Sequence, residues 1–433
     1  MEKLKKLFII AMILTLSTMR IGYAQEDSNV NQMLYEAVVN NDYNSVSNYI
    51  DQGANVNATT EDGTSVLMYA CGILDNVKII KLLLDKGASV TAVDNNGDTA
   101  LTSVGNQCSF TTDVSPIIEA LITAGADVNA KNNRGRTALI NMADTNYNNV
   151  KILIDNGASV NTRDNEGNTP LHEAQRMGKN LDITNLLLQN GADVNARNNH
   201  RETPLMLTEN IEYANALLKK GADLNAQADS GRSCLIRKCY NKNDHDLARF
   251  FINYGADLNL RDNEGNTALH VASKSANTEI ITLLLTKGAK VNVKNDNGET
   301  PLFYIIIDEE HELSSKDQTE LLKLFINKGA DVNIKDNEGN TPLMACFSDN
   351  YCDMASLKFL VNNGANVNIC NNEGRYPVML ALEISDKAAV EFLISKKAKL
   401  DVKDNSGKSV MEYALETDSA SIIDMIKKAV GNE

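Results

Sequence analysis

Histidine is the side chain best suited to acid–base chemistry near neutral pH, and the chain holds five, His172, His200, His245, His270 and His311. A catalytic site of the Ser-His-Asp or Cys-His type needs such a histidine beside a nucleophile and a third group that orients it. These five are scattered along the sequence, and nothing in their spacing brings such groups together. We therefore expect no catalytic residue and no enzymatic activity.

A polar segment that shares some residues with a metal-binding loop occurs three times. Asp-Asn-Glu-Gly-Asn-Thr stands at 164–169, 262–267 and 336–341. It lacks the Asp-x-Asp-x-Asp-Gly order and the terminal glutamate of a calcium loop. The same residues suit a tight turn, in which Asx and Thr side chains satisfy backbone amides. We expect a hairpin at these positions, with no metal and no cofactor.

These turns belong to a repeat that runs through most of the chain. A Gly-Ala pair followed by a segment similar to Asp-Val-Asn recurs at intervals of 34, 38, 32, 34, 30, 34, 33, 41 and 35 residues. The first residues of these pairs are Gly53, Gly87, Gly125, Gly157, Gly191, Gly221, Gly255, Gly288, Gly329 and Gly364. A second glycine, in x-Gly-x-Thr-Pro-Leu at its best, follows most pairs, and the two positions together hold 20 of the 25 glycines. A period of this length predicts a stack of similar units.

Each unit is expected to be a hairpin-like finger followed by two helices. The glycine of Gly-Ala follows an apolar run such as 280–285, where a residue that tolerates positive φ ends a helix. Threonines after the turn are expected to cap the next helix with their hydroxyls, with proline tolerated in its first turn. They are Thr169, Thr203, Thr267, Thr300 and Thr341. Leu171, Ala174 and Leu187 fall on an apolar stripe that predicts the core.

The sequence resembles the ankyrin repeat. The family signature Thr-Pro-Leu-His-x-Ala stands at 169–174, and 267–272 matches it closely. The resemblance implies a mainly α solenoid of about twelve stacked helix-turn-helix units, curved so that fingers and first helices line the concave side. It also implies that His172 and His270 bond neighbouring backbone across the stack. The expected units are 28–60, 61–94, 95–132, 133–164, 165–198, 199–228, 229–262, 263–295, 296–336, 337–371, 372–404 and 405–430.

Several units depart from the pattern. Arg201 replaces the turn glycine in the short sixth unit, so we expect a distorted finger and first helix there, and Lys397 replaces the glycine of Gly-Ala. The first and last units are expected to act as caps that present one face to water. Insertions at 106–114 and 308–318 are either binding loops or surface insertions without a function.

The seven cysteines form no disulfide framework or zinc motif. Cys71, Cys239 and Cys346 stand at small buried positions of the repeat and are expected to pack in the core. Cys108, Cys352 and Cys370 fall in expected loops or turns and could be reactive or paired, while Cys234 replaces a repeat proline. A metal- or redox-responsive protein is therefore kept as an alternative function.

Charge and the first residues bear on location and partners. The net charge of −15 disfavours nucleic acid as a partner. Basic residues before the turns, Lys131, Arg163, Arg197, Arg261, Lys294, Lys335 and Lys403, are expected to form local solvated pairs with Asn or Asp. Lys3, Lys5 and Lys6, a short apolar run and Gly22-Tyr23-Ala24 predict a signal peptide over 1–24, cleaved after Ala24. A buried N-terminal helix is the alternative. Cleavage would leave a periplasmic or secreted chain with no membrane insertion.

The function implied by the resemblance is a noncatalytic, monomeric scaffold for protein–protein interaction, with a secreted effector acting on a host protein as an alternative. By the same resemblance, the partner-binding candidates are finger residues and residues at the end of the first helix. They are Asn165, Glu166, Asn168, Arg176, Met177, Asn199, His200, Asp229, Ser230, Arg232, Tyr240, Asn263, Glu264, Asn266 and Lys274. Arg176, Met177, Arg232 and Tyr240 are expected to be the strongest anchors.

Overall fold

The computed structural model describes residues 27–73, 76–107, 113–240, 245–307, 313–347 and 353–431. The predicted signal peptide with Ala24, together with Cys108, His311, Cys352, most of the insertion at 106–114 and the first part of that at 308–318, lies outside the described residues. Within them the secondary structure is helical, apart from isolated bridges between Thr59 and Ser65 and between Lys403 and Ser409.

The chain divides into an N-terminal unit, Met1–Ala222, and a C-terminal unit, Asp223–Glu433. Among the described residues of the N-terminal unit, six helix pairs follow one another. The first helices of these pairs are α2 (Asp27–Val39), α4 (Val66–Cys71), α6 (Ala100–Gln107), α8 (Ala138–Met142), α10 (Pro170–Met177) and α12 (Pro204–Leu207). The second helices are α3 (Tyr43–Asp51), α5 (Val77–Asp85), α7 (Ser115–Thr123), α9 (Tyr147–Asp155), α11 (Leu181–Gln189) and α13 (Ile211–Lys219).

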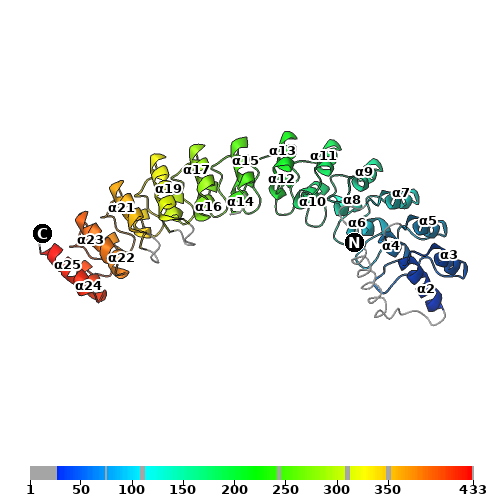
Figure 1. Ribbon diagram of the computed structural model, residues 1–433, viewed down its shortest axis with the longest axis horizontal. Coiled ribbons are helices and arrows are strands. Elements are labelled where there is room, and N and C mark those ends of the chain that lie inside the picture. The colour runs from blue at the N-terminus through cyan, green and yellow to red at the C-terminus, as the bar shows by residue number, and fades with distance from the viewer. Residues whose placement is uncertain are drawn as a thin grey trace. The chain divides into compact units, whose positions relative to one another are not determined.

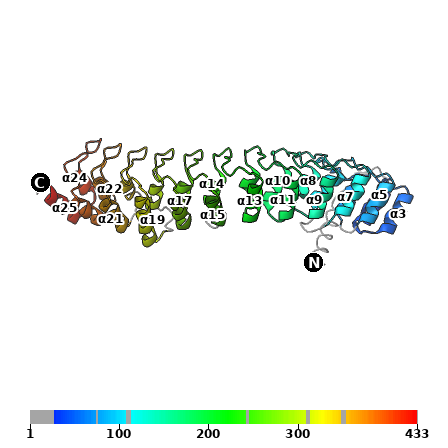
Figure 2. The same cartoon turned by 90° about the horizontal axis from the view of Figure 1, so that it is seen from above.

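Six further pairs follow in the part of the C-terminal unit that the structure describes. Its first helices are α14 (Cys234–Cys239), α16 (Ala268–Lys274), α18 (Pro301–Ile307), α20 (Pro342–Ala345), α22 (Pro377–Glu383) and α24 (Val410–Glu416). Its second helices are α15 (Asp246–Tyr254), α17 (Thr278–Thr286), α19 (Ser315–Asn327), α21 (Met354–Asn362), α23 (Lys387–Ser395) and α25 (Ala420–Val430). Within each unit, first helices contact first helices and second helices contact second helices along two rows (Figure 1). In the C-terminal unit the fingers project as a row of loops on one side of the helices (Figure 2).

The core lies between the two rows and is built in layers, as the apolar stripe predicts. Leu171, Ala174 and Leu187 are all buried. Gly255 ends α15 with φ of 103°, a conformation that costs a residue with a Cβ roughly 1–2 kcal/mol. Lys397 adopts φ of 66° at the equivalent position.

Two sequence expectations about local structure are wrong in part, since the first helix of the sixth unit is short and Thr169 and Thr267 do form capping boxes. Arg201 takes φ of 57° and donates its backbone N–H to Asn198 O at 2.9 Å, the bond that Gly167 makes to Asp164 O in its own finger. The finger therefore keeps its geometry, although the four-residue α12 is short. The hydroxyls of Thr203, Thr300 and Thr341 are buried without a hydrogen-bond partner among the described residues, so these threonines do not cap through Oγ1.

Candidate binding site

Successive fingers are joined through asparagine side chains and backbone. Asn263 donates its backbone N–H to Ser230 O at 3.0 Å and its side-chain Nδ2 to Asp229 O at 2.7 Å. Asn165 makes the same pair of bonds to the preceding finger, at 2.9 and 2.8 Å. These amides stabilise the stack of fingers. Asn165 and Asn263 therefore have a structural role beside the predicted role in partner binding.

Three of the basic residues before the turns reach across the stack instead of forming local pairs, whereas Arg261 forms an exposed ion pair with Asp296. Lys131 Nζ donates to Arg163 O at 2.9 Å, Lys294 Nζ to Lys335 O at 2.6 Å and Lys335 Nζ to Cys370 O at 2.7 Å. Each donor thus bonds the carbonyl of the equivalent residue in the next repeat. The expectation of local solvated pairs is wrong for these three, because the side chain spans the gap between neighbouring fingers.

The two signature histidines occupy the structural position that the resemblance implies. His172 Nε2 lies 3.1 Å from Glu202 O, and His270 Nε2 lies 3.2 Å from Glu299 O. Each Nδ1 lies near the backbone nitrogen of the preceding threonine, Thr169 or Thr267. Burial lowers the pKa of both imidazoles, that of His270 to about 4. Each neutral histidine therefore connects the first turn of its own helix to the backbone of the next finger.

Six of the predicted binding residues converge on one groove of the C-terminal unit. Arg232, Tyr240, Asn263, Glu264, Asn266 and Lys274 line a cavity of about 490 Å³ between fingers and first helices. We call it the finger groove. It is also lined by His270, Val271, Asn295, Asp296, Asn297 and Tyr304, and so joins residues of three consecutive repeats.

Arg232 and Tyr240 form one wall of the finger groove. The guanidinium carbon of Arg232 lies 4.1 Å from the centre of the Tyr240 ring, and its NH2 group lies 3.2 Å from the phenolic oxygen. Both side chains are held near the buried carboxylate of Asp262, at 3.9 Å from Arg232 and 3.4 Å from Tyr240. Burial, opposed in part by Arg232, raises the pKa of Tyr240. An aromatic ring under a cation offers a partner both apolar area and charge.

Tyr304 forms the other wall, and the sequence analysis missed it. Its hydroxyl donates to Glu299 Oε2 at 2.7 Å, and Lys274 Nζ lies 5.8 Å from the centre of its ring. The sequence analysis considered finger residues and residues at the end of the first helix, whereas Tyr304 lies in the first turn of α18. Val271 occupies the equivalent place in α16 and also lines the groove.

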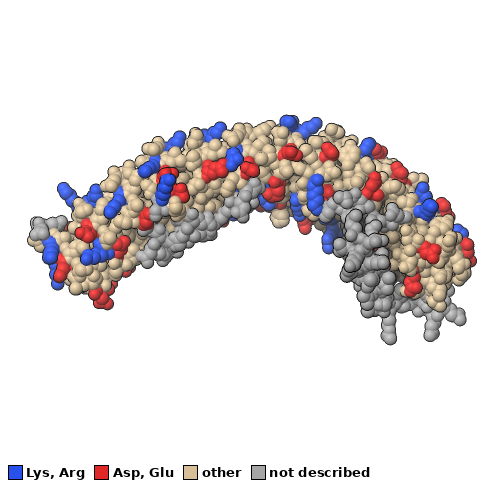
Figure 3. Space-filling view, in the orientation of Figure 1, with Lys and Arg blue, Asp and Glu red and all other residues tan. Residues whose placement is uncertain are grey.

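The other predicted residues are spread over the fingers and helix ends. Asn168 is 1% exposed, which contradicts its prediction as a residue that faces a partner, and Asn266, although it lines the finger groove, is only 8% exposed. Their amide oxygens instead accept bonds from Asn198 and Asn295. The exposed residues are Asn165, Glu166, Arg176, Met177, Asn199, His200, Asp229 and Ser230. Acidic and basic side chains are interspersed over the visible face of each unit (Figure 3).

The cysteines divide by burial. Cys71, Cys239 and Cys346 pack in the core as expected, and Cys234 is buried with them. Burial raises the pKa of Cys234 and of Cys239 to about 12, so little reactive thiolate forms at either position. Cys370 is partly exposed. Among the described residues no group of three His, Cys, Asp or Glu side chains is placed to hold a metal ion.

Fingers joined by asparagines, paired helices and buried signature histidines define a protein of stacked helix-turn-helix repeats. Models of ankyrin repeats match residues 34–104, 106–198, 206–295 and 353–432, and a related ankyrin model matches 310–357. The chain belongs to the ankyrin repeat family.

Curated relatives match only short stretches. The chain is 40% identical over 72 residues to the mouse protein fem-1 homolog A-like and 46% identical over 54 residues to the human transient receptor potential cation channel subfamily A member 1. It is 42% identical over 66 residues to a putative ankyrin repeat protein of fowlpox virus. These alignments cover 17%, 12% and 15% of this chain and 11%, 5% and 19% of the relatives. In the described ranges, every helix is too short or too polar to cross a membrane.

Proposed function

We propose that the chain is a noncatalytic scaffold that binds a protein partner through the finger groove. The observation that carries the proposal is the convergence of Arg232, Tyr240, Lys274 and Tyr304 on one cavity. Fold-stabilising bonds in the same repeats are made by Asn263, His270 and the basic residues before the turns. Arg232, Tyr240, Lys274 and Tyr304 are not among these residues and can therefore serve recognition. Tyrosine and arginine are common energetic anchors at protein interfaces.

Affinity purification with three forms of the full chain tests the proposal. The baits are the unmodified chain, the Arg232→Ala/Tyr240→Ala double variant and, as control, Glu391→Lys on the exposed side of α23. We expect quantitative mass spectrometry to find a partner depleted at least about tenfold by the groove variant and retained by the control. Equal recovery of every protein with the three baits would exclude the finger groove as the recognition site.

We further propose that the mature chain is exported to the periplasm or outside the cell. Support comes from the sequence alone, in the lysines at 3, 5 and 6, the apolar run and Gly22-Tyr23-Ala24. Cell fractionation followed by intact-mass measurement tests this, because export with cleavage predicts a chain that begins at Gln25. A cytoplasmic chain that retains Met1 would contradict it.

A further inference from the structure

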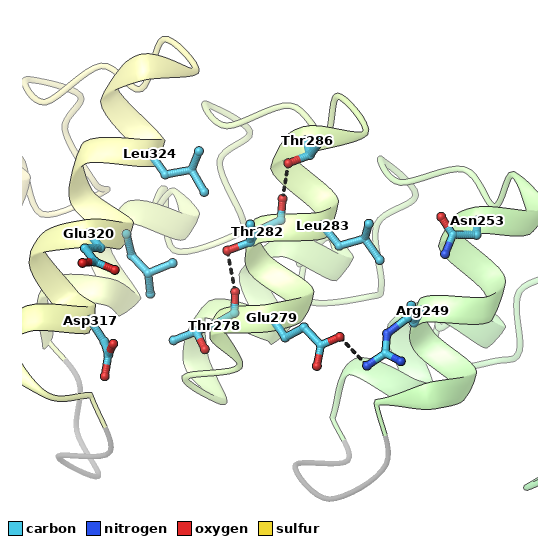
Figure 4. A pocket seen from close by; sticks show the side chains of 11 residues that line it. Arg249, Asn253, Thr278, Glu279, Thr282, Leu283, Thr286, Asp317, Glu320 and Leu324 are labelled. Atoms are coloured by element: carbon cyan, nitrogen blue, oxygen red, sulfur yellow. Dashed lines mark hydrogen bonds and ion pairs between the residues drawn. The ribbon is translucent and has the colours of Figure 1, made fainter.

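A second groove lies on the row of second helices in the C-terminal unit. It has a volume of about 660 Å³ and is lined by side chains of α15, α17 and α19 (Figure 4). We call it the second-helix groove. None of its lining residues belongs to the finger groove.

Helix α19 is longer than the second helices beside it. It has 13 residues, whereas α15, α17, α21 and α23 each have nine. Both α17 and α19 end immediately before a Lys-Gly pair, so their C-terminal ends are equivalent. The added turn is therefore at the start of α19, and it carries Asp317. Ser314 caps this turn by accepting the backbone N–H of Asp317 at 3.1 Å. The added turn therefore makes the α19 wall of the groove longer than the α17 wall.

The floor of the groove is apolar. Leu283 and Leu324 are half-buried and Leu321 is buried, and Figure 4 shows Leu324 pointing from α19 toward α17. The hydroxyls of Thr282 and Thr286 donate to carbonyl oxygens of their own helix at 2.7 Å. With these hydroxyls satisfied, the surface can take up apolar side chains without losing a hydrogen bond.

The rim on α19 carries negative charge. Arg249, across the groove on α15, is paired with Glu279 and with Asp246. Asp317 and Glu320 form no ion pair with any described residue, and the exposed Lys316 and Lys323 of α19 lie outside the lining. Asp317 Oδ2 accepts the Ser314 hydroxyl at 2.6 Å, a bond that does not neutralise its charge, so both carboxylates can attract a positively charged partner.

We propose that the second-helix groove binds an amphipathic helix of a protein partner that carries leucine-type residues on one side and Lys or Arg beside them. A surface between adjacent helices accepts a third helix through apolar side chains spaced one turn apart. The apolar side chains of the partner contact Leu283, Leu321 and Leu324, and its cations face Asp317 and Glu320, which gives charge complementarity. The scaffold then has two separate binding faces, and this one does not rest on the function proposed for the finger groove.

Fluorescence anisotropy with the full chain tests the proposal. The probe is a labelled helical peptide with leucines at i, i+3, i+4 and i+7 and lysines elsewhere, used at physiological ionic strength. We expect saturable one-to-one binding that the Asp317→Lys/Glu320→Lys variant weakens at least about tenfold. Thr282→Arg, which places a long cation in the groove, should weaken binding similarly. Asp317, Glu320 and Thr282 are exposed, so we expect each variant to fold. Circular dichroism checks this.

Two variants serve as controls. Glu391→Lys reverses one carboxylate charge on another second helix, and Tyr240→Ala alters only the finger groove, so both should change the peptide affinity by less than about twofold. The proposal is overturned if Glu391→Lys weakens binding as much as the groove variants, since that indicates general attraction to an acidic chain. It is also overturned if a peptide with glutamates in place of lysines binds equally well, if peptide binding is not saturable, or if sedimentation shows the groove occupied by a second copy of the chain.

Discussion

The guanidinium carbon of Arg232 lies 4.1 Å from the centre of the Tyr240 ring, although the two residues flank helix α14 and neither belongs to it. Their contact closes one side of the finger groove around the buried carboxylate of Asp262. Tyr240 is 38% exposed, so its ring remains accessible to a partner.

Replacement of Tyr240 should therefore separate binding from stability. We expect Tyr240→Ala to weaken binding of a finger-groove partner by about 2 kcal/mol, because it removes an aromatic anchor. Its free energy of unfolding in urea should change by less than about 1 kcal/mol, since substitutions at exposed positions are usually mild. Tyr240→Phe, which keeps the ring, should bind nearly as well. Lost stability together with unchanged affinity would assign Tyr240 to the scaffold instead.

The asparagine three residues after most Gly-Ala pairs should stabilise the stack. Asn292 donates Nδ2 to Gly329 O at 2.8 Å and accepts the backbone N–H of Asp331 at 2.9 Å through Oδ1. We expect Asn292→Ala to lower the free energy of unfolding by about 1–2 kcal/mol, because it removes two hydrogen bonds between repeats. Asn327→Ala, at an exposed site on α19, is the control and should be close to neutral. Urea unfolding curves that coincide for the two variants would argue against this role.

Sequence patterns predicted the elements of this fold better than the bonds between them. Glycine spacing predicted where helices end, and the resemblance at 169–174 implied that His172 bonds neighbouring backbone, as it does at Glu202 O. The bond from Lys335 Nζ to Cys370 O joins residues 35 positions apart, and the period alone does not say which groups meet. Tyr304 was missed for the same reason. The groove beside α19 depends on one added helical turn, which the 41-residue spacing showed only as an insertion.

Substitution of two finger glycines should distinguish the cost of a positive φ from the cost of a steric clash with the next finger. Gly265 has φ of 78°, and a Cβ there would lie 2.9 Å from the backbone nitrogen of Asp296 in the next finger. Gly407 has φ of 89°, but a Cβ there meets nothing within 4 Å. Gly407→Ala should therefore cost about 1–2 kcal/mol of unfolding free energy, from φ alone. Gly265→Ala should cost at least about 1 kcal/mol more, as measured by urea unfolding. Equal losses would show that the fingers can move apart freely.

His270 should make stability depend on pH. Burial lowers its pKa from 6.5 to about 4 in the folded chain. The unfolded chain therefore binds more protons between these values, so the free energy of unfolding falls as pH is lowered through this window and levels off below it. The full contribution is roughly 3 kcal/mol. Urea unfolding at pH 7 and pH 4.5 should show a smaller difference for His270→Gln than for the unmodified chain. His200→Gln, at an exposed finger tip, is the control, and a pH difference that His270→Gln leaves unchanged would contradict the prediction.

The described cysteines should differ in reactivity toward a thiol reagent. Cys234 and Cys239 are buried, with pKa values raised to about 12, whereas Cys370 is partly exposed. Because the thiolate is the reacting species, we expect Cys370 to be modified first and Cys234 and Cys239 only after unfolding. Mass spectrometry of peptides after timed labelling in native buffer and in urea measures the order, with Cys370→Ser as the control. Rapid modification of Cys234 or Cys239 in native buffer would show that these repeats open readily, and it would favour the redox-responsive alternative over a purely structural role for these thiols.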